Sequence, residues 1–517
     1  MKRALLVILL AACPAPRATP VHHAASGPGL VVLVIIDQFP EWSFERKRTE
    51  LTHGFARILR EGEWRIGRHP SAATLTAPGH ALLGTGATPD ETGIIANEWW
   101  LRDLGKPIKA AEDEAGKTSS KWLRVPGLGD AVAAAHSGAK AVAVSLKNRA
   151  AVLPLGHAGL AIYYDTNTAS FTAYRGAAPW LPAHNRAHPV TPRLVPWQPR
   201  DPARLAQLSG VVDAQPGEVG EKGFGATFPH DPKTTTNPAD SVYAMPLGND
   251  LVLETALAAI DGEQLGADDK IDLLIVSLSA HDYIAHGWGH ESWEAWDSEL
   301  RLDEALDHFL AELDRKVGAG RWAMAMTSDH GGSPMPELTA GGRYTDEQIK
   351  AAANQAASLV LGPGEWIAYA NLPTVYLSKA ALAQDPKELA NAVKKIVFAL
   401  RAFPGLAAVD RVDAFAGHCA DRQGDARALC LTFDAERSGE VFYLPAKGWI
   451  VEEEGERLAT AHGSLHDYDR NVPVVLLPFG RKPHPPVALP GAELPLTDVA
   501  PLLAGWLGVT PPTALPR

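Results

Sequence analysis

The stretch LVVLVIID at residues 30–37 predicts the centre of the fold. Seven apolar, mostly β-branched residues in a row are typical of a strand buried on both faces, and an aspartate follows directly. Similar runs occur at 140–146, 271–278, 322–327 and 472–477, with helical patterns at 128–136, 250–260 and 298–317. Buried strands that alternate with helices indicate a mostly parallel sheet sandwiched by helices, so we expect an α/β fold.

Two long segments interrupt this alternation. Residues 166–249 are rich in Pro, Gly, Asp and Trp and predict a loop-rich insertion. Residues 336–458 contain helical patterns and two short strand patterns, at 374–377 and 440–444, and predict an inserted α+β cap. We therefore expect one domain over residues 28–517, preceded by a targeting segment and tether over residues 1–27.

The composition is that of an ordinary globular protein. Hydrophobic residues make up 46% of the chain and charged residues 21%, which excludes a wholly disordered protein. The formal net charge of −12 argues against a nucleic-acid partner bound through a broad basic face. An anionic substrate would have to be attracted by local positive charge, from metal ions or from a few Lys and Arg side chains.

The N-terminus has the pattern of a bacterial export signal. Residues 1–3 (MKR) are basic, residues 4–12 are apolar but too few to span a bilayer, and LAAC at residues 10–13 resembles a lipobox. We expect lipidation of Cys13 and an exported lipoprotein, periplasmic or at the outer membrane, that meets the membrane only through this anchor. An ordinary signal peptide with a chance cysteine is the alternative.

Two cysteines remain, Cys419 and Cys430. In an exported protein they predict one disulfide that closes a small loop. A metal site that combines these cysteines with His418 is the alternative.

Acidic and imidazole side chains follow the predicted strands. Asp37 follows the first strand, Asp329 and His330 follow the strand at 322–327, and Asp282 and His286 lie four residues apart beyond the strand at 271–278. Ligands bind at the carboxyl ends of strands in such sheets, and mixed Asp/His sets suit zinc, with manganese next. Each residue alone is more often a turn residue, a helix cap or a surface pair, but together they predict a metal centre.

Two further motifs fit an anionic substrate. In SAATLTAPGHALLGTG (residues 71–86), Thr76 precedes Pro78 at the start of a helical pattern, where free N–H groups favour anions and a hydroxyl nucleophile. Simple helix capping by Thr76 or Thr74 is the alternative. Lys147 and Arg149 follow the strand at 140–146 and suit a phosphate dianion, although such residues are usually solvated surface.

Six sequence stretches occur in the same order as in a known family, and their combination makes the resemblance specific. The sequence resembles the alkaline phosphatase superfamily, and within it the PafA-type (phosphate-irrepressible) bacterial alkaline phosphatases with a threonine nucleophile. The stretches span about residues 31–477 and read VVLVIIDQF, TLTAPGHALLGTG, ETGIIANEWW, VSLKNRAAVLPLGH, SLSAHDYIAHGWG with TSDHGG, and AHGSLHDYDRNVPVVL.

The resemblance implies a zinc-dependent phosphate monoester hydrolase that acts on small-molecule phosphate esters through a phosphothreonine intermediate. Thr76 would be the nucleophile, and Asn97, Lys147 and Arg149 would bind the phosphoryl oxygens. Two Zn²⁺ ions per chain are implied, one held by Asp37, Thr76, Asp329 and His330 and the other by Asp282, His286 and His462. We expect a monomer that is most active at neutral to alkaline pH.

The sequence departs from the family pattern at Ala285 and at Leu465-His466, which follow the HGS motif, so His466 remains an alternative to His462. A nucleotide pyrophosphatase/phosphodiesterase on the same scaffold is the main alternative function, and it would need an apolar groove in place of Lys147 and Arg149. A sulfatase would need a C/S-x-P-x-R motif, and a non-catalytic binding lipoprotein would have no use for a complete metal set.

Overall fold

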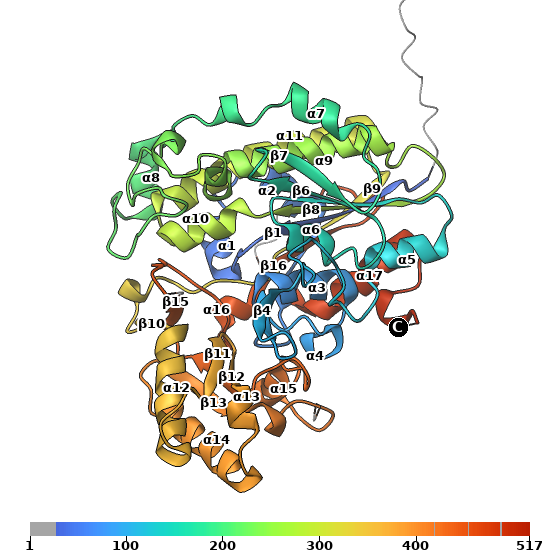
Figure 1. The fold of residues 1–517 in the computed structure, drawn as a ribbon. Coiled ribbons are helices and arrows are strands. Elements are labelled where there is room, and N and C mark those ends of the chain that lie inside the picture. Colours follow the sequence, from blue (N-terminus) through green and yellow to red (C-terminus); the bar gives the residue numbers. More distant parts are fainter. Residues whose placement is uncertain (1–26, 418, 453, 486–488, 517) are drawn as a thin grey trace, which may run out of the picture.

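The computed structural model describes residues 27–417, 419–452, 454–485 and 489–516. A nine-stranded sheet lies at its centre (Figure 1). In spatial order its strands are β17 (Gly491–Pro495), β2 (Glu63–Arg68), β16 (Asn471–Leu477), β9 (Trp322–Thr327), β1 (Leu30–Ile36), β8 (Asp272–Leu278), β5 (Ala141–Ser145), β6 (Leu160–Asp165) and β7 (Ser170–Tyr174). All five strands predicted from apolar runs are present in this sheet.

The central strands from β9 to β6 run parallel, which confirms the mostly parallel sheet. The strand expected at 472–477 differs in direction, because β16 pairs antiparallel with β9 and with β2. The chain reaches β16 from the carboxyl edge of the sheet, where the Gly331 N–H donates to the Asp469 carbonyl at 2.8 Å. A strand that starts at this edge has to run away from it, opposite to β9.

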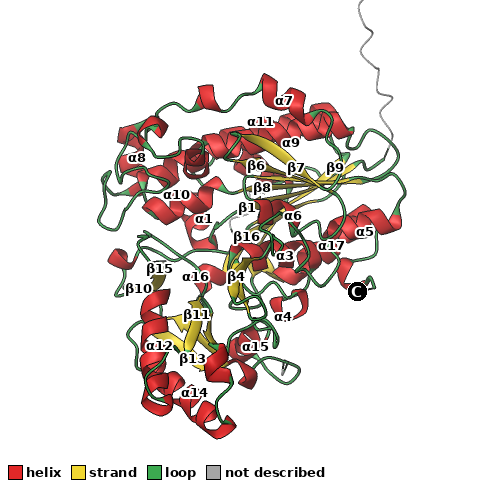
Figure 2. Ribbon diagram, in the orientation of Figure 1, coloured by secondary structure: helices red, strands yellow, loops and turns green. Residues whose placement is uncertain are grey.

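Helices cover both faces of the sheet (Figure 2). One face carries α9 (Leu247–Glu263), α10 (Ala280–Trp288) and α11 (Trp293–Leu313); the other carries α3 (Thr76–Thr85), α5 (Leu128–Ala135), α6 (Asn148–Val152) and α17 (Val499–Leu507). Alternate residues of β1 enter the two cores, Val32 and Val34 on one side and Val31 and Leu33 on the other. The strand is therefore buried on both faces, as its unbroken apolar run predicts.

A smaller unit, drawn in orange, lies below the sheet in Figure 1. It has a four-stranded antiparallel sheet in the order β11 (Ile367–Asn371), β12 (Thr374–Leu377), β14 (Val441–Pro445), β13 (Leu406–Arg411), and a hydrophobic core of its own. Helices α12 (Asp346–Leu361), α13 (Lys379–Leu382), α14 (Pro386–Arg401) and α15 (Gly424–Cys430) complete it. We call it the cap. β10 (Arg343–Thr345) and β15 (Ile450–Glu452) pair where the chain enters and leaves the cap.

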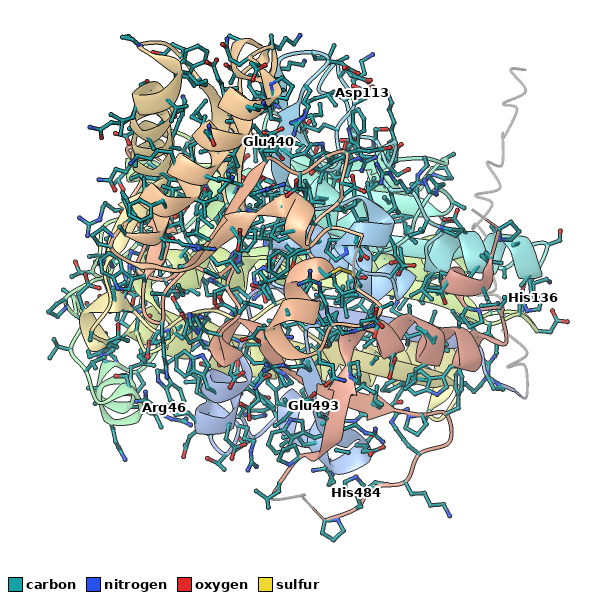
Figure 3. The ribbon with its side chains drawn as sticks, turned by 90° about the horizontal axis from the view of Figure 1, so that it is seen from below. Arg46, Asp113, His136, Glu440, His484 and Glu493 are labelled. Carbon is teal, nitrogen blue, oxygen red and sulfur yellow. A yellow bond between two sulfur atoms is a disulfide. The ribbon has the colours of Figure 1, made fainter. Side chains whose placement is uncertain are left out.

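A disulfide joins Cys419 to Cys430 in the cap. His418 and Cys13, on which the metal-site alternative and the lipid anchor depend, lie outside the described residues. The hairpin of β3 (Glu98–Leu101) and β4 (Lys106–Lys109) is tied to the cap by Arg102, whose Nη2 lies 2.7 Å from Oε1 of Glu440. Figure 3 shows Glu440 on the same side of the molecule as Asp113, which follows this hairpin.

The segment over residues 166–249 is less separate from the main sheet than expected. Its first part is β7, which forms an antiparallel hairpin with β6 and closes one edge of the sheet. The rest contains α7 (Leu181–Ala187), α8 (Pro202–Ser209) and long turns. The remaining short helices are α1 (Glu41–Lys47), α2 (Gly54–Glu61), α4 (Pro89–Thr92) and α16 (Asp467–Arg470). Within the described ranges, no helix is both long and apolar enough to cross a membrane.

Candidate active site

The predicted metal ligands come together at the carboxyl edge of the sheet. Asp37 follows β1, Asp329 and His330 follow β9, and α10 carries Asp282 and His286 one turn apart after β8. The loop that returns from the cap adds His462. Possible ligand atoms lie within 4.8 Å of one another in two groups that share a histidine: Asp37, Asp329 and His330, and Asp282, His330 and His462. His286 Nε2 lies 3.2 Å from Asp282 Oδ1 and extends the second group.

The imidazoles of His286, His330 and His462 are each oriented by a hydrogen bond at Nδ1. Nδ1 of His286, His330 and His462 lies 2.8, 2.9 and 2.8 Å from the backbone carbonyls of Thr460, Gly331 and Thr74. A carbonyl only accepts hydrogen bonds, so each Nδ1 carries a proton, and in the neutral imidazole Nε2 then presents its lone pair. This is the arrangement in which histidine binds a metal through Nε2 and is oriented by a hydrogen bond at Nδ1.

The inner atoms of the site are left without hydrogen-bond partners. Among the described residues, Asp37 Oδ1, Asp282 Oδ1 and His330 Nε2 are buried and form no hydrogen bond, and their near neighbours are other predicted ligand atoms, such as His286 Nε2 beside Asp282 Oδ1 and His330 Nε2 beside Asp37 Oδ1. Unpaired buried polar atoms are costly, and here they converge from three different elements. A set of carboxylate oxygens and imidazole nitrogens of this kind fits zinc. The side chains present therefore fit the metal pair that the sequence predicts.

Lys147 lies between the two metal-ligand groups. Its Nζ is 2.6 Å from Asp37 Oδ2 and 2.5 Å from Asp282 Oδ2, and the side chain is buried. Burial disfavours the ammonium form, but the carboxylates of Asp282 and Asp37 outweigh burial and raise the pKa of Lys147. The lysine is thus a fixed positive charge at the centre of the site. In this structure it bonds the predicted metal ligands, where we expected it to face the phosphoryl group.

Thr76 and Thr74 have different surroundings. Thr76 is the first residue of α3 and is buried at the edge of the site. Its hydroxyl makes no hydrogen bond within the part of the chain that the structure describes. The Thr74 hydroxyl instead accepts the backbone N–H groups of Gly463 and Ser464, each at 3.1 Å. The Thr74 hydroxyl is therefore held by structural contacts that the Thr76 hydroxyl lacks among the described residues.

The other predicted phosphate-binding residues line one cavity of about 450 Å³. Asn97 accepts the Ala77 N–H through Oδ1 at 2.8 Å, which leaves its amide N–H groups for a ligand. Nε of Arg149, at the start of α6, is buried without a partner among the described residues. His286 and His462 line the same cavity, so part of the predicted metal-ligand set borders the space that Asn97 and Arg149 line. His466 does not contribute, since its Nε2 is 3.2 Å from the Pro445 carbonyl.

Several residues of the cavity wall could not be identified from the sequence. Glu221 and Lys222 come from the segment over residues 166–249, and Asn371 and Leu372 come from the β11–β12 turn of the cap. Tyr283, next to Asp282 on α10, also lines the cavity. Tyr283 lies in the stretch SLSAHDYIAHGWG without a role of its own, and the other four belong to no motif quoted above. The one signal for Lys222 is its place between glycines in GEKG at residues 220–223.

The chain matches a known family over most of its length. The family described as type I phosphodiesterase / nucleotide pyrophosphatase matches residues 31–469. The chain is 30% identical to alkaline phosphatase PhoV from Synechococcus elongatus over 513 residues, which cover 94% of this chain and 91% of that protein. It is 28% identical to alkaline phosphatase PafA from Elizabethkingia meningoseptica, over 95% of this chain and 93% of that protein.

Solved structures agree with these sequence matches. The crystal structure of wild-type alkaline phosphatase PafA is similar with a TM-score of 0.83 and 26% identity, over 96% of this chain and 98% of that chain. Murine ectonucleotide pyrophosphatase / phosphodiesterase 5, at a TM-score of 0.54 and 14% identity, shares the fold. The chain therefore belongs to the type I phosphodiesterase / nucleotide pyrophosphatase family, within the alkaline phosphatase superfamily.

Proposed function

We propose that this protein is a zinc-dependent phosphate monoester hydrolase, an alkaline phosphatase of broad specificity that acts through a phosphothreonine intermediate on Thr76. The observation that carries this proposal is that a metal-ligand set, the buried Thr76 and the buried Lys147 lie beside a cavity lined by Asn97, Arg149, His286 and His462. Similarity to proteins named alkaline phosphatases supports the same reaction class.

The residues of the site have distinct roles in this proposal. Asp37, Asp329 and His330 would hold one zinc ion together with Thr76, and Asp282, His286 and His462 would hold the other. When bound, two zinc ions supply Lewis-acid stabilisation of negative charge on the reacting oxygens. Removal of zinc by a chelator should abolish hydrolysis and return of zinc should restore it; full activity at a metal content near zero would refute the requirement.

The chain's own groups carry out the transfer in two displacements. The Thr76 oxygen attacks phosphorus, a Thr76–phosphate bond forms and the bond to the ester oxygen breaks. Water then attacks the same phosphorus and releases phosphate and the Thr76 hydroxyl. The Asn97 amide and Arg149 would stabilise charge on the non-reacting phosphoryl oxygens, as donors aimed at a transition state do, and Lys147 would add its positive charge from its place between Asp37 and Asp282. The N-terminus of α3 favours the anion in the same place.

The charge of the substrate distinguishes this function from diester hydrolysis. A monoester carries roughly one more negative charge than a diester near neutral pH. Replacement of both Lys147 and Arg149 by alanine should lower kcat/KM for p-nitrophenyl phosphate by a factor of at least about 10², on the scale of lost oxyanion donors. The effect on bis(p-nitrophenyl) phosphate should be much smaller. Equal losses on both esters would leave the two residues important but would remove this reason for preferring the monoesterase over the phosphodiesterase.

We also propose that the protein is exported as a monomeric lipoprotein anchored through Cys13 alone. Cys13→Ser should move it from the membrane fraction to the soluble exported fraction. Unchanged membrane association would contradict a single anchor.

A further inference from the structure

One loop of the segment over residues 166–249 is packed directly on the helix that carries Asp282 and His286. The N–H groups of Val219 and Gly220 both donate to the Gly287 carbonyl of α10 at 2.9 Å. The contact is so close that a Cβ atom at Gly287 would lie 2.7 Å from Cβ of Glu221. The loop at residues 220–223, which we call the GEKG loop, is therefore held at a fixed place beside the metal-ligand groups.

The backbone of this loop is unusual at Lys222. Its φ of 52° lies in the left-handed region, between Gly220 at 81° and Gly223 at 85°. A residue with a Cβ atom costs about 1–2 kcal/mol in this conformation, which glycine adopts freely. Strained residues of this kind concentrate at functional sites, where the position of the side chain matters. A lysine therefore occupies a strained backbone position at which glycine would be unstrained.

The Lys222 side chain points to the candidate active site. Its Nζ lies 4.5 Å from the centre of the Tyr283 ring, and Nζ of Lys147 lies 4.8 Å from the same ring centre. Lys222 lines the cavity together with Asn97 and Arg149. Lys147, Arg149 and Lys222 therefore form a series of cations that starts between the metal ligands and continues along the cavity wall.

Lys222 is charged under the conditions of the reaction. Burial disfavours the ammonium form, but Tyr283 and Glu221 outweigh burial and raise its pKa. Its ion-pair partner among the described residues is its neighbour Glu221, at 3.0 Å, and the carboxylate of Glu456 lines the same cavity. Leu75, Leu372 and Leu458 line the same cavity and suit a carbon skeleton.

We propose that Lys222 is a specificity-determining residue, whose ammonium group binds a second anionic group carried on the leaving-group part of a phosphate monoester. The proposal rests on the monoesterase function proposed above. The substrate class is phosphate esters with an additional carboxylate or phosphate. Arg149 and Asn97 would bind the phosphoryl group, and Lys222 would bind the second anion further out in the cavity.

A pair of substrates that differ in this anion tests the proposal. We would measure kcat/KM for 3-carboxyphenyl phosphate and for 3-carbamoylphenyl phosphate, which is neutral at the same position. For Lys222→Met the ratio of the two values should fall about tenfold, as expected for loss of one charge-assisted contact. Lys222→Arg should retain most of the ratio. Lys233→Met, an exposed lysine of the same segment that does not line the cavity, should leave it unchanged.

A second variant separates specificity from folding. Lys222→Gly relieves the strained backbone, so it should raise Tm while the ratio falls as in Lys222→Met. An unchanged ratio in Lys222→Met or Lys222→Gly would overturn the proposal, as would equal losses on both substrates. Failure of the monoesterase function is seen separately, as a wild-type preference for bis(p-nitrophenyl) phosphate over p-nitrophenyl phosphate.

Discussion

Thr76, the first residue of α3, and Thr74, which precedes the helix, differ in the hydrogen bonds of their hydroxyl groups. Thr74 accepts two backbone N–H groups, from Gly463 and Ser464, whereas Thr76 has no such contact within the described ranges. Thr76→Ala should lower kcat/KM by at least about 10³-fold, because it removes the nucleophile. Thr76→Ser should keep substantial activity, since it keeps the hydroxyl.

Thr74→Ala is the matched control for this prediction. It leaves the buried Gly463 N–H without an acceptor, whereas the Ser464 N–H keeps Asp469 Oδ2 at 3.0 Å. Thr74→Ala should therefore destabilise the protein by about 1–3 kcal/mol while activity falls far less than in Thr76→Ala. Thermal unfolding and steady-state kinetics on both variants check the two effects. Comparable losses of kcat/KM at both positions, or a trapped phosphopeptide that contains phosphorylated Thr74, would show that the nucleophile is assigned to the wrong threonine.

Residue types and spacing predict that Asp37, Asp329 and His330 come together, as the structure shows, because each follows a strand with a continuous apolar run. The same reasoning does not predict that Lys147 contacts both Asp37 and Asp282, since this depends on a side-chain rotamer chosen by local charge. Residue types and spacing do not identify Lys222 either, because its position depends on how the GEKG loop packs against Gly287.

At the scale of the element, α3 approaches the strand end that carries Asp329 very closely. A Cβ atom at Gly79 would lie 2.4 Å from the Asp329 carbonyl oxygen, so Gly79→Ala has to push the helix away from a predicted metal ligand. Crowding of this kind typically costs about 1–3 kcal/mol. We expect a clear fall in Tm and a loss of kcat/KM of roughly tenfold or more, because small displacements in an active site reduce rates strongly.

Gly505→Ala provides the control, because Gly505 lies in α17 with no atom within 4 Å of the added Cβ. Alanine is the better helix former there, so stability should rise by about 0.5–1 kcal/mol with unchanged activity. Wild-type Tm and activity in Gly79→Ala would contradict the close approach of α3 to Asp329.

The elements themselves are predicted from the sequence more securely than their connections. The apolar runs place β1, β5, β8, β9 and β16 within one or two residues, because a buried strand needs an unbroken apolar sequence. The antiparallel direction of β16 and the membership of β7 in the main sheet do not follow from those runs. Both depend on where the preceding loop leaves the chain, which is a tertiary property.

For the whole molecule, burial of acidic groups determines how stability changes with pH. Burial raises the pKa of Glu218 from 4.5 to about 8, that of Asp469 to about 7 and that of Asp250 to about 6. A carboxyl group whose pKa is higher in the folded than in the unfolded state binds its proton more tightly when folded. Its contribution therefore favours folding at low pH and is lost as pH rises from the ordinary value to the raised value.

Glu218→Gln tests this relation within one protein. Glu218 accepts the Gln215 N–H at 3.1 Å, an interaction that the glutamine carbonyl oxygen can keep, and the variant has no charge to desolvate. Compared with the wild type, both loaded with zinc, its Tm should be higher by about 2–3 °C at pH 9 and by less than about 1 °C at pH 5. Asp269→Asn, which replaces an exposed carboxylate, should show no such trend with pH.

A Tm difference for Glu218→Gln that is the same at pH 5 and pH 9 would mean that Glu218 does not change its protonation state on folding in this range. Any loss of stability toward alkaline pH would then have to come from other buried acids, with Asp250→Asn as the next variant to measure.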